Sequence, residues 1–199
     1  MGFALTLPTG YSWGPVGQPL PVPYEAPQGR RLNAIGGYFS HGPQAGRLEF
    51  VSYASLPKNK AKQPRKTLAQ RAADHGLTEE ELGVLDSELF LAFVWYLAGR
   101  PPDALAGWRR VRPLVLVVDN YQTHKSDRVK AERPLLAAAG VTLLYLPAYS
   151  PELSRIEPIW NDVQYHGLPR RSYPTLGELK RAVDLALVEK RLGLRETAA

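Results

Sequence analysis

Two short apolar runs, residues 114–118 and 141–146, constrain the fold more than any other feature of the chain. Each is continuous and of strand length, which predicts strands buried on both faces. The segment between them, residues 126–140, has a helical composition, contains Pro134 and stops at Gly140. Two strands joined by a helix make a right-handed parallel βαβ unit. We therefore expect an α/β fold with a parallel strand pair in its core.

The remaining pattern predicts one hairpin and three more helices. Residues 30–40 and 47–56 are short β-like runs separated by the turn sequence HGPQAG. Residues 78–99 have apolar side chains at helical spacing behind a Thr78/Glu81 capping box. Further helices are expected to begin at residue 154 and to span residues 173–192, the second behind a Thr175/Glu178 capping box. Residues 1–30, rich in Gly and Pro, are expected to form loops and short edge pieces.

Composition narrows the class of protein. A chain of 199 residues fits a single domain, which we expect to span residues 1–199. The net charge of +6 favours a polyanionic partner, and the absence of cysteine excludes disulfides and thiolate metal sites. No apolar run approaches the roughly 18 residues of a membrane span, and the first residues do not resemble a signal peptide. We expect a protein of a reducing cytoplasm without membrane segments.

Asp119 ends the first apolar run, and functional groups in α/β sheets gather beyond the carboxyl ends of parallel strands. A carboxylate fixed there is a ligand of the kind that Mg²⁺ prefers. The alternative is that Asp119 only caps the turn that follows.

Glu157 lies in the sequence SRIEPIW and has two interpretations. Ser154 and Glu157 have the spacing of a capping box, in which the carboxylate would only satisfy a backbone N–H. In the other interpretation Glu157 faces Asp119, with Asn161 on the same helical face.

The motifs around these two acids resemble a known family. An apolar strand followed by Asp119, Asn120, His124 and Lys125, and then the block LPAYSPELSRIEPIW from residue 146 to 160, resemble the catalytic domain of DDE transposases. The resemblance is to the mariner-like bacterial insertion-sequence group, within the retroviral-integrase superfamily. Early segments, GYSWGPVGQP and GRRLNAIGGYFS, also resemble that family's first strands.

The resemblance implies a fold and a mechanism. The fold would be ribonuclease-H-like, a mixed sheet flanked by helices. Asp119 and Glu157 would help to hold two Mg²⁺ ions, for which Mn²⁺ can substitute, and these would drive DNA cleavage and strand transfer. Asn120, His124 and Asn161 would orient water or phosphate.

One departure from the family pattern concerns the first acid. In the family it lies in an Asp-Glu-x-Gly-Phe segment, and here Met1 occupies the x, so we expect that acid upstream of Met1. A helix-turn-helix region is also expected upstream. The chain would then be incomplete and inactive by itself, unless a carboxylate such as Glu49 or Asp86 substitutes. The alternative function is a non-catalytic remnant that binds DNA or a transposase subunit.

DNA contacts are expected to go mostly to phosphates. The resemblance implies transposon ends and target DNA as partners, a homodimer, and a place at the bacterial nucleoid. Each basic run can also be a solvated loop. The candidate contact residues are Lys58, Lys60, Lys62, Arg65, Lys66, Lys125, Arg128, Tyr149, Arg170 and Arg171.

Overall fold

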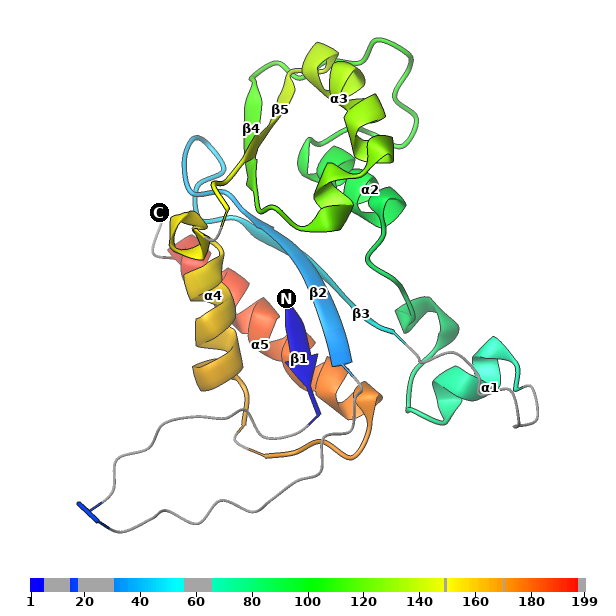
Figure 1. Cartoon of the computed structure of the whole chain (residues 1–199), viewed down its shortest axis with the longest axis vertical. Helices are drawn as coiled ribbons and strands as arrows, with labels where there is room; N and C mark the ends of the chain where they lie inside the picture. Colours follow the sequence, from blue (N-terminus) through cyan, green and yellow to red (C-terminus); the bar gives the residue numbers. More distant parts are fainter. Residues whose placement is uncertain (6–14, 18–30, 56–65, 149, 170, 197–199) are drawn as a thin grey trace.

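A computed structural model of the chain describes residues 1–5, 15–17, 31–55, 66–148, 150–169 and 171–196. Among these, the strands form two separate sheets, a three-stranded sheet in the order β1-β2-β3 and a two-stranded sheet of β4 and β5 (Figure 1). The chain is therefore α/β as expected, but the strands do not form the single mixed sheet that the resemblance implied. The helices lie on both sides of the strands.

The first sheet is antiparallel. β3 (Leu48–Ala54) pairs along its whole length with β2 (Arg31–Tyr38), from Leu32 to Tyr38, and the two form the hairpin that the sequence predicts. β1 (Gly2–Ala4) pairs with only the first part of β2, where Gly2 lies opposite Asn33. Met1 extends this ladder by one step, because its backbone nitrogen and oxygen both bond to Ala34.

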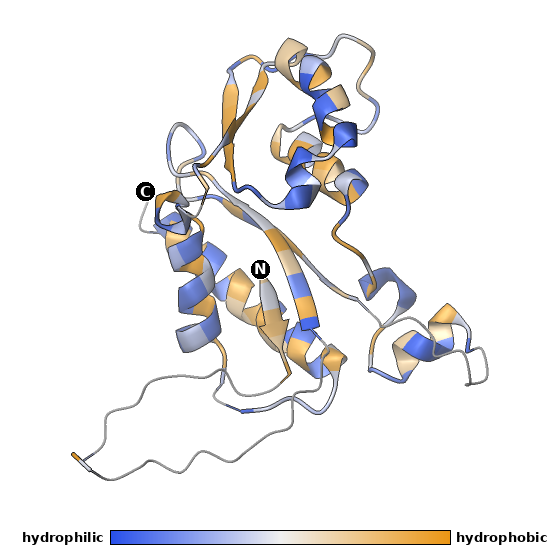
Figure 2. Ribbon diagram, viewed as in Figure 1, coloured by the Kyte–Doolittle hydropathy of each residue, from blue (hydrophilic) through white to orange (hydrophobic). Residues whose placement is uncertain are grey.

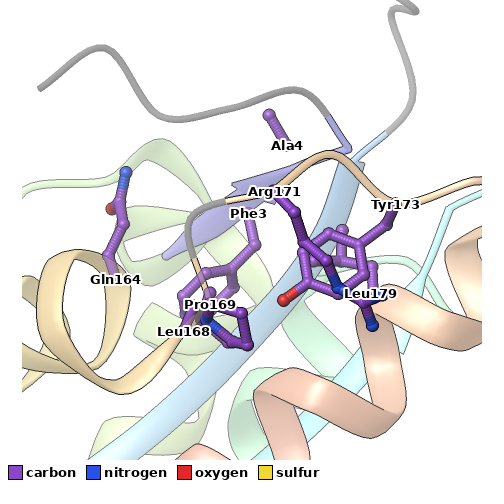
Figure 3. A pocket seen from close by; sticks show the side chains of 8 residues that line it. All are labelled: Phe3, Ala4, Gln164, Leu168, Pro169, Arg171, Tyr173 and Leu179. Atoms are coloured by element: carbon purple, nitrogen blue, oxygen red, sulfur yellow. The ribbon is translucent and has the colours of Figure 1, made fainter.

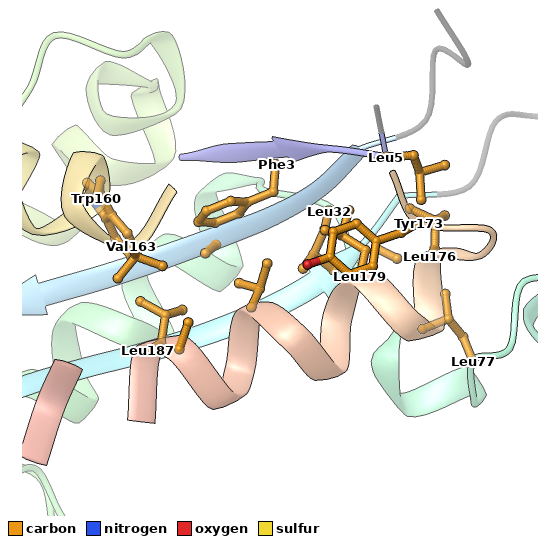
Figure 4. Close-up of a cluster of buried hydrophobic side chains, with 14 of the residues drawn as sticks. Phe3, Leu5, Leu32, Leu77, Trp160, Val163, Tyr173, Leu176, Leu179 and Leu187 are labelled. Atoms are coloured by element: carbon orange, nitrogen blue, oxygen red, sulfur yellow. The ribbon is translucent and has the colours of Figure 1, made fainter. Parts of the chain in front are cut away.

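The carboxyl-terminal helices pack against this sheet. α4 (Glu157–Asp162) leads through a π-helical turn (Val163–Gly167) to α5 (Leu176–Glu196), the predicted closing helix. The hydroxyl of Thr175 accepts the backbone N–H of Glu178 at 3.2 Å, so the predicted cap of α5 is present. Figure 4 shows the resulting core, in which Phe3 and Leu32 from the sheet meet Trp160, Leu179 and Leu187 from the helices.

Two adjacent glycines let helices approach β2 from both faces. A Cβ atom at Gly36 would lie 2.7 Å from the ring of Trp160 in α4, and one at Gly37 would lie 2.6 Å from Leu97 in α2 (Ser87–Leu97). Real Cβ contacts are not that short, so a side chain at Gly36 would collide with the rigid indole, and one at Gly37 would require the Leu97 side chain to shift. β2 is thereby held between α4 on one face and α2 on the other.

The predicted βαβ unit is present. β4 (Leu114–Val118), α3 (Asp127–Ala138) and β5 (Val141–Tyr145) follow one another, and the two strands pair in parallel. Pro134 lies within α3, and Gly140 ends it with a φ of 78°.

The prediction that both strands are buried on both faces is wrong. Leu114, Leu116 and Val118 pack against the core beneath α2 and α3, whereas Val115 and Val117 are 57% and 52% exposed. β5 alternates in the same way. Figure 2 shows β4 as largely hydrophobic nevertheless, so its exposed face is apolar.

The single helix predicted for residues 78–99 is also wrong. The Thr78/Glu81 box is present, with Glu81 accepting the Thr78 backbone N–H at 2.8 Å, but it begins only a 3-10 turn (Glu79–Glu81). The chain then extends, and Gly83 donates its N–H to Ala54 at the end of β3. α2 begins afterwards, capped by Asp86.

A short helix, α1 (Leu68–Ala73), precedes the 3-10 turn. Within the described part of the chain, no helix is both long enough and apolar enough to cross a membrane.

Candidate active site

Asp119 directly follows β4, and its side chain is 63% exposed. One carboxylate oxygen, Oδ1, accepts the backbone N–H of Tyr121 at 3.0 Å. This bond closes a local turn, so Asp119 does cap the turn that follows it, as the alternative interpretation predicted. The second oxygen, Oδ2, has no hydrogen-bond partner among the described residues and remains available to a ligand.

His124 holds the same oxygen of Asp119. Its Nδ1 lies 2.7 Å from Oδ1 and has no other polar partner in the described ranges. The geometry is that of a close polar contact and not of a straight hydrogen bond. The His124 ring is 14% exposed and stacks on Phe90 of α2 at a centroid distance of 4.2 Å. The Tyr145 hydroxyl donates to the His124 backbone oxygen at 2.6 Å, which fixes the turn carrying the ring.

These neighbours set the charge state of Asp119. The nearby His124 ring lowers the pKa of the Asp119 carboxyl below its ordinary value; partial burial opposes this effect, and the Tyr121 backbone N–H adds to it. Asp119 is therefore ionised at neutral pH, which is the form that a divalent cation binds.

Glu157 is not part of a capping box. The residue preceding α4 is Ile156, and it provides no side-chain cap; Ser154 contributes only its backbone oxygen, which accepts the Glu157 N–H at 3.1 Å. Within the described part of the chain, the half-buried Glu157 carboxylate has neither a hydrogen bond nor an ion pair. The capping interpretation of Glu157 is thus wrong, and the Glu157 carboxylate is available to a ligand.

Asp119, His124 and Glu157 line one cleft of about 950 Å³, between the two sheets. The two acids come from separate units, because Asp119 follows β4 while Glu157 begins α4 beside β2. Both carboxylates raise the pKa of the Met1 ammonium, although burial, the larger effect, lowers it. The amino end of β1 therefore lies within electrostatic range of both acids.

The two asparagines are placed differently. Neither Asn120 nor Asn161 is among the residues that line the cleft. The Asn120 amide donates to the backbone oxygen of Leu146 and so ties the ends of β4 and β5 together. Asn161 is exposed on α4. A role for either in orienting water or phosphate stays a prediction.

Several candidate DNA contacts are engaged elsewhere or lie outside the described ranges. Lys66 pairs with Asp74 at 2.6 Å. Arg128 is held by Glu88 and Glu132, each at 2.7 Å, and joins α2 to α3. Lys125 is exposed beside His124. Six candidates lie outside the described residues: Lys58, Lys60, Lys62, Arg65, Tyr149 and Arg170.

Arg171 lies at a second, much smaller pocket of about 40 Å³. Figure 3 shows it beside Tyr173, above whose ring its guanidinium stacks at 5.2 Å. Phe3, Leu168 and Leu179 line the same pocket, which is mainly apolar. Arg171 therefore remains a solvent-facing cation, but it does not line the cleft that holds the two acids.

Residues that the sequence interpretation missed also line the acidic cleft. Arg31, Arg155 and Tyr121 belong to its walls, and all three are exposed. Neither arginine forms an ion pair with another described residue. Arg155 lies two positions before Glu157, within the block that carried the resemblance, so its position was the signal that could have identified it.

The donor set fits a divalent metal only in part. Among the residues that the structure describes, no group of three or more His, Asp or Glu side chains could hold a metal ion. Asp119 and Glu157 nevertheless offer free carboxylate oxygens to one cleft. Mg²⁺ is commonly held by one or two carboxylates, with water and substrate phosphates completing its shell. The two residues suit such an open site.

Comparison with known proteins identifies the class. A family model described as DDE superfamily endonuclease matches residues 70–180, which include Asp119 and Glu157. This is more than half of the chain, and the chain belongs to that superfamily. Membership supports a transposase-type nuclease function, implies DNA as the substrate, and agrees with the general use of divalent metals by such domains. No curated protein and no solved structure matches the chain.

Proposed function

We propose that this chain is the catalytic domain of an insertion-sequence transposase of the mariner-like group, acting in metal-dependent DNA cleavage and strand transfer. The observation that carries the proposal is the meeting of Asp119 and Glu157 in one cleft, although one follows β4, the other begins α4, and they lie 38 positions apart (157 − 119). The Glu157 carboxylate has no hydrogen bond or ion pair with the described residues, and Asp119 uses only one of its two carboxylate oxygens in such contacts.

In this proposal Asp119 and Glu157 hold the metal, and His124 fixes one oxygen of Asp119 so that the other faces the cleft. When bound, divalent ions supply Lewis-acid activation of a water or a DNA 3′-hydroxyl and stabilise the leaving oxygen. Arg155 and Arg31 are placed on the cleft walls to contact phosphates, and Tyr121 is exposed enough to stack on a base. Lys125 and Arg171 provide outer contacts to the DNA backbone.

The alternation of β1 supports a third acid close by. Phe3 faces the core beneath α4 and α5, and Met1 has the same orientation along the strand. A residue placed two positions before Met1 would face that side too, opposite Gly36 in the ladder that Met1 and Ala34 continue. The resemblance assigns an aspartate to that position, and we propose that cleavage depends on it.

The proposed assembly is a homodimer acting on transposon ends and target DNA at the bacterial nucleoid, in the cytoplasm. Residues 1–199 would form one catalytic domain within it.

Calorimetric titration with Mg²⁺ or Mn²⁺ tests the metal site first. We expect binding by the 199-residue chain, its loss in Asp119→Asn, and its retention in Asp127→Asn, which changes an exposed carboxylate paired with Lys130 on α3. Equal binding by all three proteins would contradict the assignment.

A cleavage assay then tests the activity itself. The chain preceded by Asp-Glu should nick DNA carrying its cognate ends when Mg²⁺ is present, whereas the same extension as Asn-Glu should not. DNA binding without cleavage by the Asp-Glu form would instead assign the non-catalytic role.

A further inference from the structure

The wall of the acidic cleft contains a buried tyrosine that plays no part in holding the two acids. Tyr53 on β3 is only 4% exposed, and its hydroxyl has no hydrogen-bond partner among the described residues. It lines the cleft together with Asn33, its cross-strand neighbour on β2, and with Ser55. Most buried hydroxyls are paired, because an unpaired one costs free energy. A ligand in the cleft would supply the partner that the described chain does not.

The Tyr53 ring is anchored at its inner end, and its hydroxyl lies toward the loop that follows β4. A Cβ atom at Gly83 would lie 3.1–3.2 Å from Cβ, Cγ and Cδ2 of Tyr53, so the inner end of the ring packs on the Gly83 backbone. Burial is the main reason why the pKa of Tyr53 is raised to about 12, and Tyr121 and Asp86 add to it. The hydroxyl is therefore neutral, able to donate and to accept, and within electrostatic range of Tyr121.

The side chains next to Tyr53 form apolar walls with an accessible aromatic ring. Val84 and Leu85 follow Gly83 along the chain and line the cleft, and Leu85 packs against the core cluster that contains Tyr53. Tyr121 also lines the cleft and is 53% exposed, so much of its ring is available to a stacking partner. Apolar walls, an accessible ring and a few polar groups suit a flat heteroaromatic ligand.

The polar groups beside Tyr53 favour a neutral ligand that forms hydrogen bonds. Nδ2 of Asn33 donates to Oγ of Ser55 at 3.2 Å, and this Oγ donates to a backbone oxygen at 2.8 Å. The side-chain oxygen of Asn33 has no donor within the described ranges. The Asp86 carboxylate, which acts on the Tyr53 hydroxyl, disfavours a phosphate there. The exposed Arg31 on the cleft wall is the better place for a phosphate.

From these observations we propose that the cleft around Tyr53 is a chamber for one unstacked nucleobase, which stacks on Tyr121 and forms a hydrogen bond with the Tyr53 hydroxyl. The Tyr53 hydroxyl is shielded from solvent, so a base reaches it by displacing the exposed side chains of Val84 and Tyr121. A base inside a duplex is stacked and paired and cannot enter. The inference rests on the proposed function and makes its substrate a nucleotide that has left the duplex beside the acids.

Mononucleotide binding tests the chamber without metal, cleavage or duplex DNA. The 199-residue chain is titrated in EDTA with deoxyadenosine monophosphate, and with deoxyribose 5-phosphate as the matched probe that lacks a base. NMR follows the tyrosine ring signals. The variants are Tyr53→Phe and Tyr121→Ala. Tyr165→Ala is the control, because this 41% exposed ring in the π-helical turn does not line the cleft.

We expect the mononucleotide to shift the Tyr53 and Tyr121 signals and to bind at least about fivefold more tightly than the sugar phosphate. Tyr121→Ala should weaken mononucleotide binding by about 5–100-fold, through the loss of stacking. Tyr53→Phe should weaken it by about 2–10-fold, through the loss of one hydrogen bond. Tyr165→Ala should bind both probes as the wild type does.

Equal affinities for the two probes would overturn the chamber, and so would unchanged mononucleotide binding in both Tyr53→Phe and Tyr121→Ala. Because EDTA removes divalent ions, these outcomes do not depend on the metal site. If base binding fails while Mg²⁺ binding through Asp119 is present, only the chamber is wrong. If base binding succeeds while Mg²⁺ binding and cleavage fail, the chamber stands and the proposed catalysis is wrong.

Discussion

Nδ1 of His124 lies 2.7 Å from Oδ1 of Asp119, the oxygen that also accepts the Tyr121 backbone N–H. Both contacts are made to one oxygen of the carboxylate and leave the other free. The ring itself is fixed from behind by Phe90 and through its own backbone by Tyr145. We therefore propose that His124, which also lines the cleft, positions the Asp119 carboxylate.

Replacing His124 with phenylalanine keeps a ring on Phe90 and removes Nδ1. We expect the affinity for Mn²⁺ to fall by about 10–100-fold, as is typical when the group that orients a metal ligand is lost. The pKa of Asp119 should rise toward its ordinary value, which carboxyl NMR can follow. His166→Phe, at an exposed histidine in the turn after α4, is the control and should bind normally. Equal affinities in the two variants would remove His124 from the site.

Glu157→Gln separates the capping interpretation from the metal interpretation. The Glu157 carboxylate has no hydrogen bond or ion pair with described residues. The free energy of unfolding of the Glu157→Gln variant should therefore differ from that of the wild type by no more than about 0.5 kcal/mol. Mn²⁺ binding should be lost. Denaturant unfolding and calorimetry on the same preparation measure both quantities, and a destabilisation with binding intact would restore the capping role.

Leu116 and Val115 are neighbours on β4 that face opposite sides. Leu116→Asp places an unpaired charge in the core beneath α2 and α3, at a cost of about 2 kcal/mol or more, and the variant should lose cooperative unfolding. Val115→Asp, at a side chain that is 57% exposed, should cost no more than about 1 kcal/mol. Circular dichroism during thermal unfolding compares the two. Similar losses in both variants would mean that the faces of β4 are assigned wrongly.

Tyr53 provides a test at alkaline pH. Burial raises the pKa of its hydroxyl to about 12, and the hydroxyl has no hydrogen-bond partner among the described residues. A phenol with a raised pKa in the folded state stabilises the fold fully below its unfolded pKa of about 10, and this contribution is lost as the pH rises from 10 to 12. Tyr53→Phe should therefore unfold less readily than the wild type in that range.

At neutral pH the same variant should be as stable as the wild type or slightly more so, since it removes an unpaired buried hydroxyl. Urea unfolding at pH 7 and at pH 11 supplies the comparison. A large loss of stability at pH 7 would show that the Tyr53 hydroxyl has a partner in solution.

Local patterns in the sequence predicted the parts of the fold that depend on neighbours along the chain. The βαβ unit followed from two apolar runs and from Gly140, whose positive φ ends the helix. The hairpin followed from a turn sequence between two β-like runs. Both are determined within stretches of a few tens of residues.

Contacts between distant segments decided the features that were missed. The helical pattern continues through Leu82 and Gly83, but pairing with Ala54 draws these residues into an extended conformation. The run from 114 to 118 is apolar at every position, so its sequence could not reveal that one face is exposed. Ser154 and Glu157 have the spacing of a capping box in the sequence. In the structure a 3-10 turn at Pro151–Leu153 precedes them, and Ile156 is the residue before the helix.

The sequence predicted the candidate site in part. The positions of Asp119 and Glu157 came from the sequence, and their convergence on one cleft agrees with it, while their metal binding stays a prediction. Asn120 shows what one-dimensional spacing omits. Asn120 follows Asp119 directly, which suggested a role beside the metal site. In the structure its side-chain amide donates to the backbone oxygen of Leu146.

Asp119 follows β4 of one sheet and Glu157 begins the helix that packs on the other sheet, and no ladder of backbone hydrogen bonds between described strands connects the two sheets. The distance between the carboxylates is therefore set by side-chain packing, chiefly where α2 and α4 close on the two glycines of β2. Packing of this kind yields to small rearrangements more easily than a continuous ladder does. We therefore expect the separation of the two carboxylates to change when a ligand binds in the cleft.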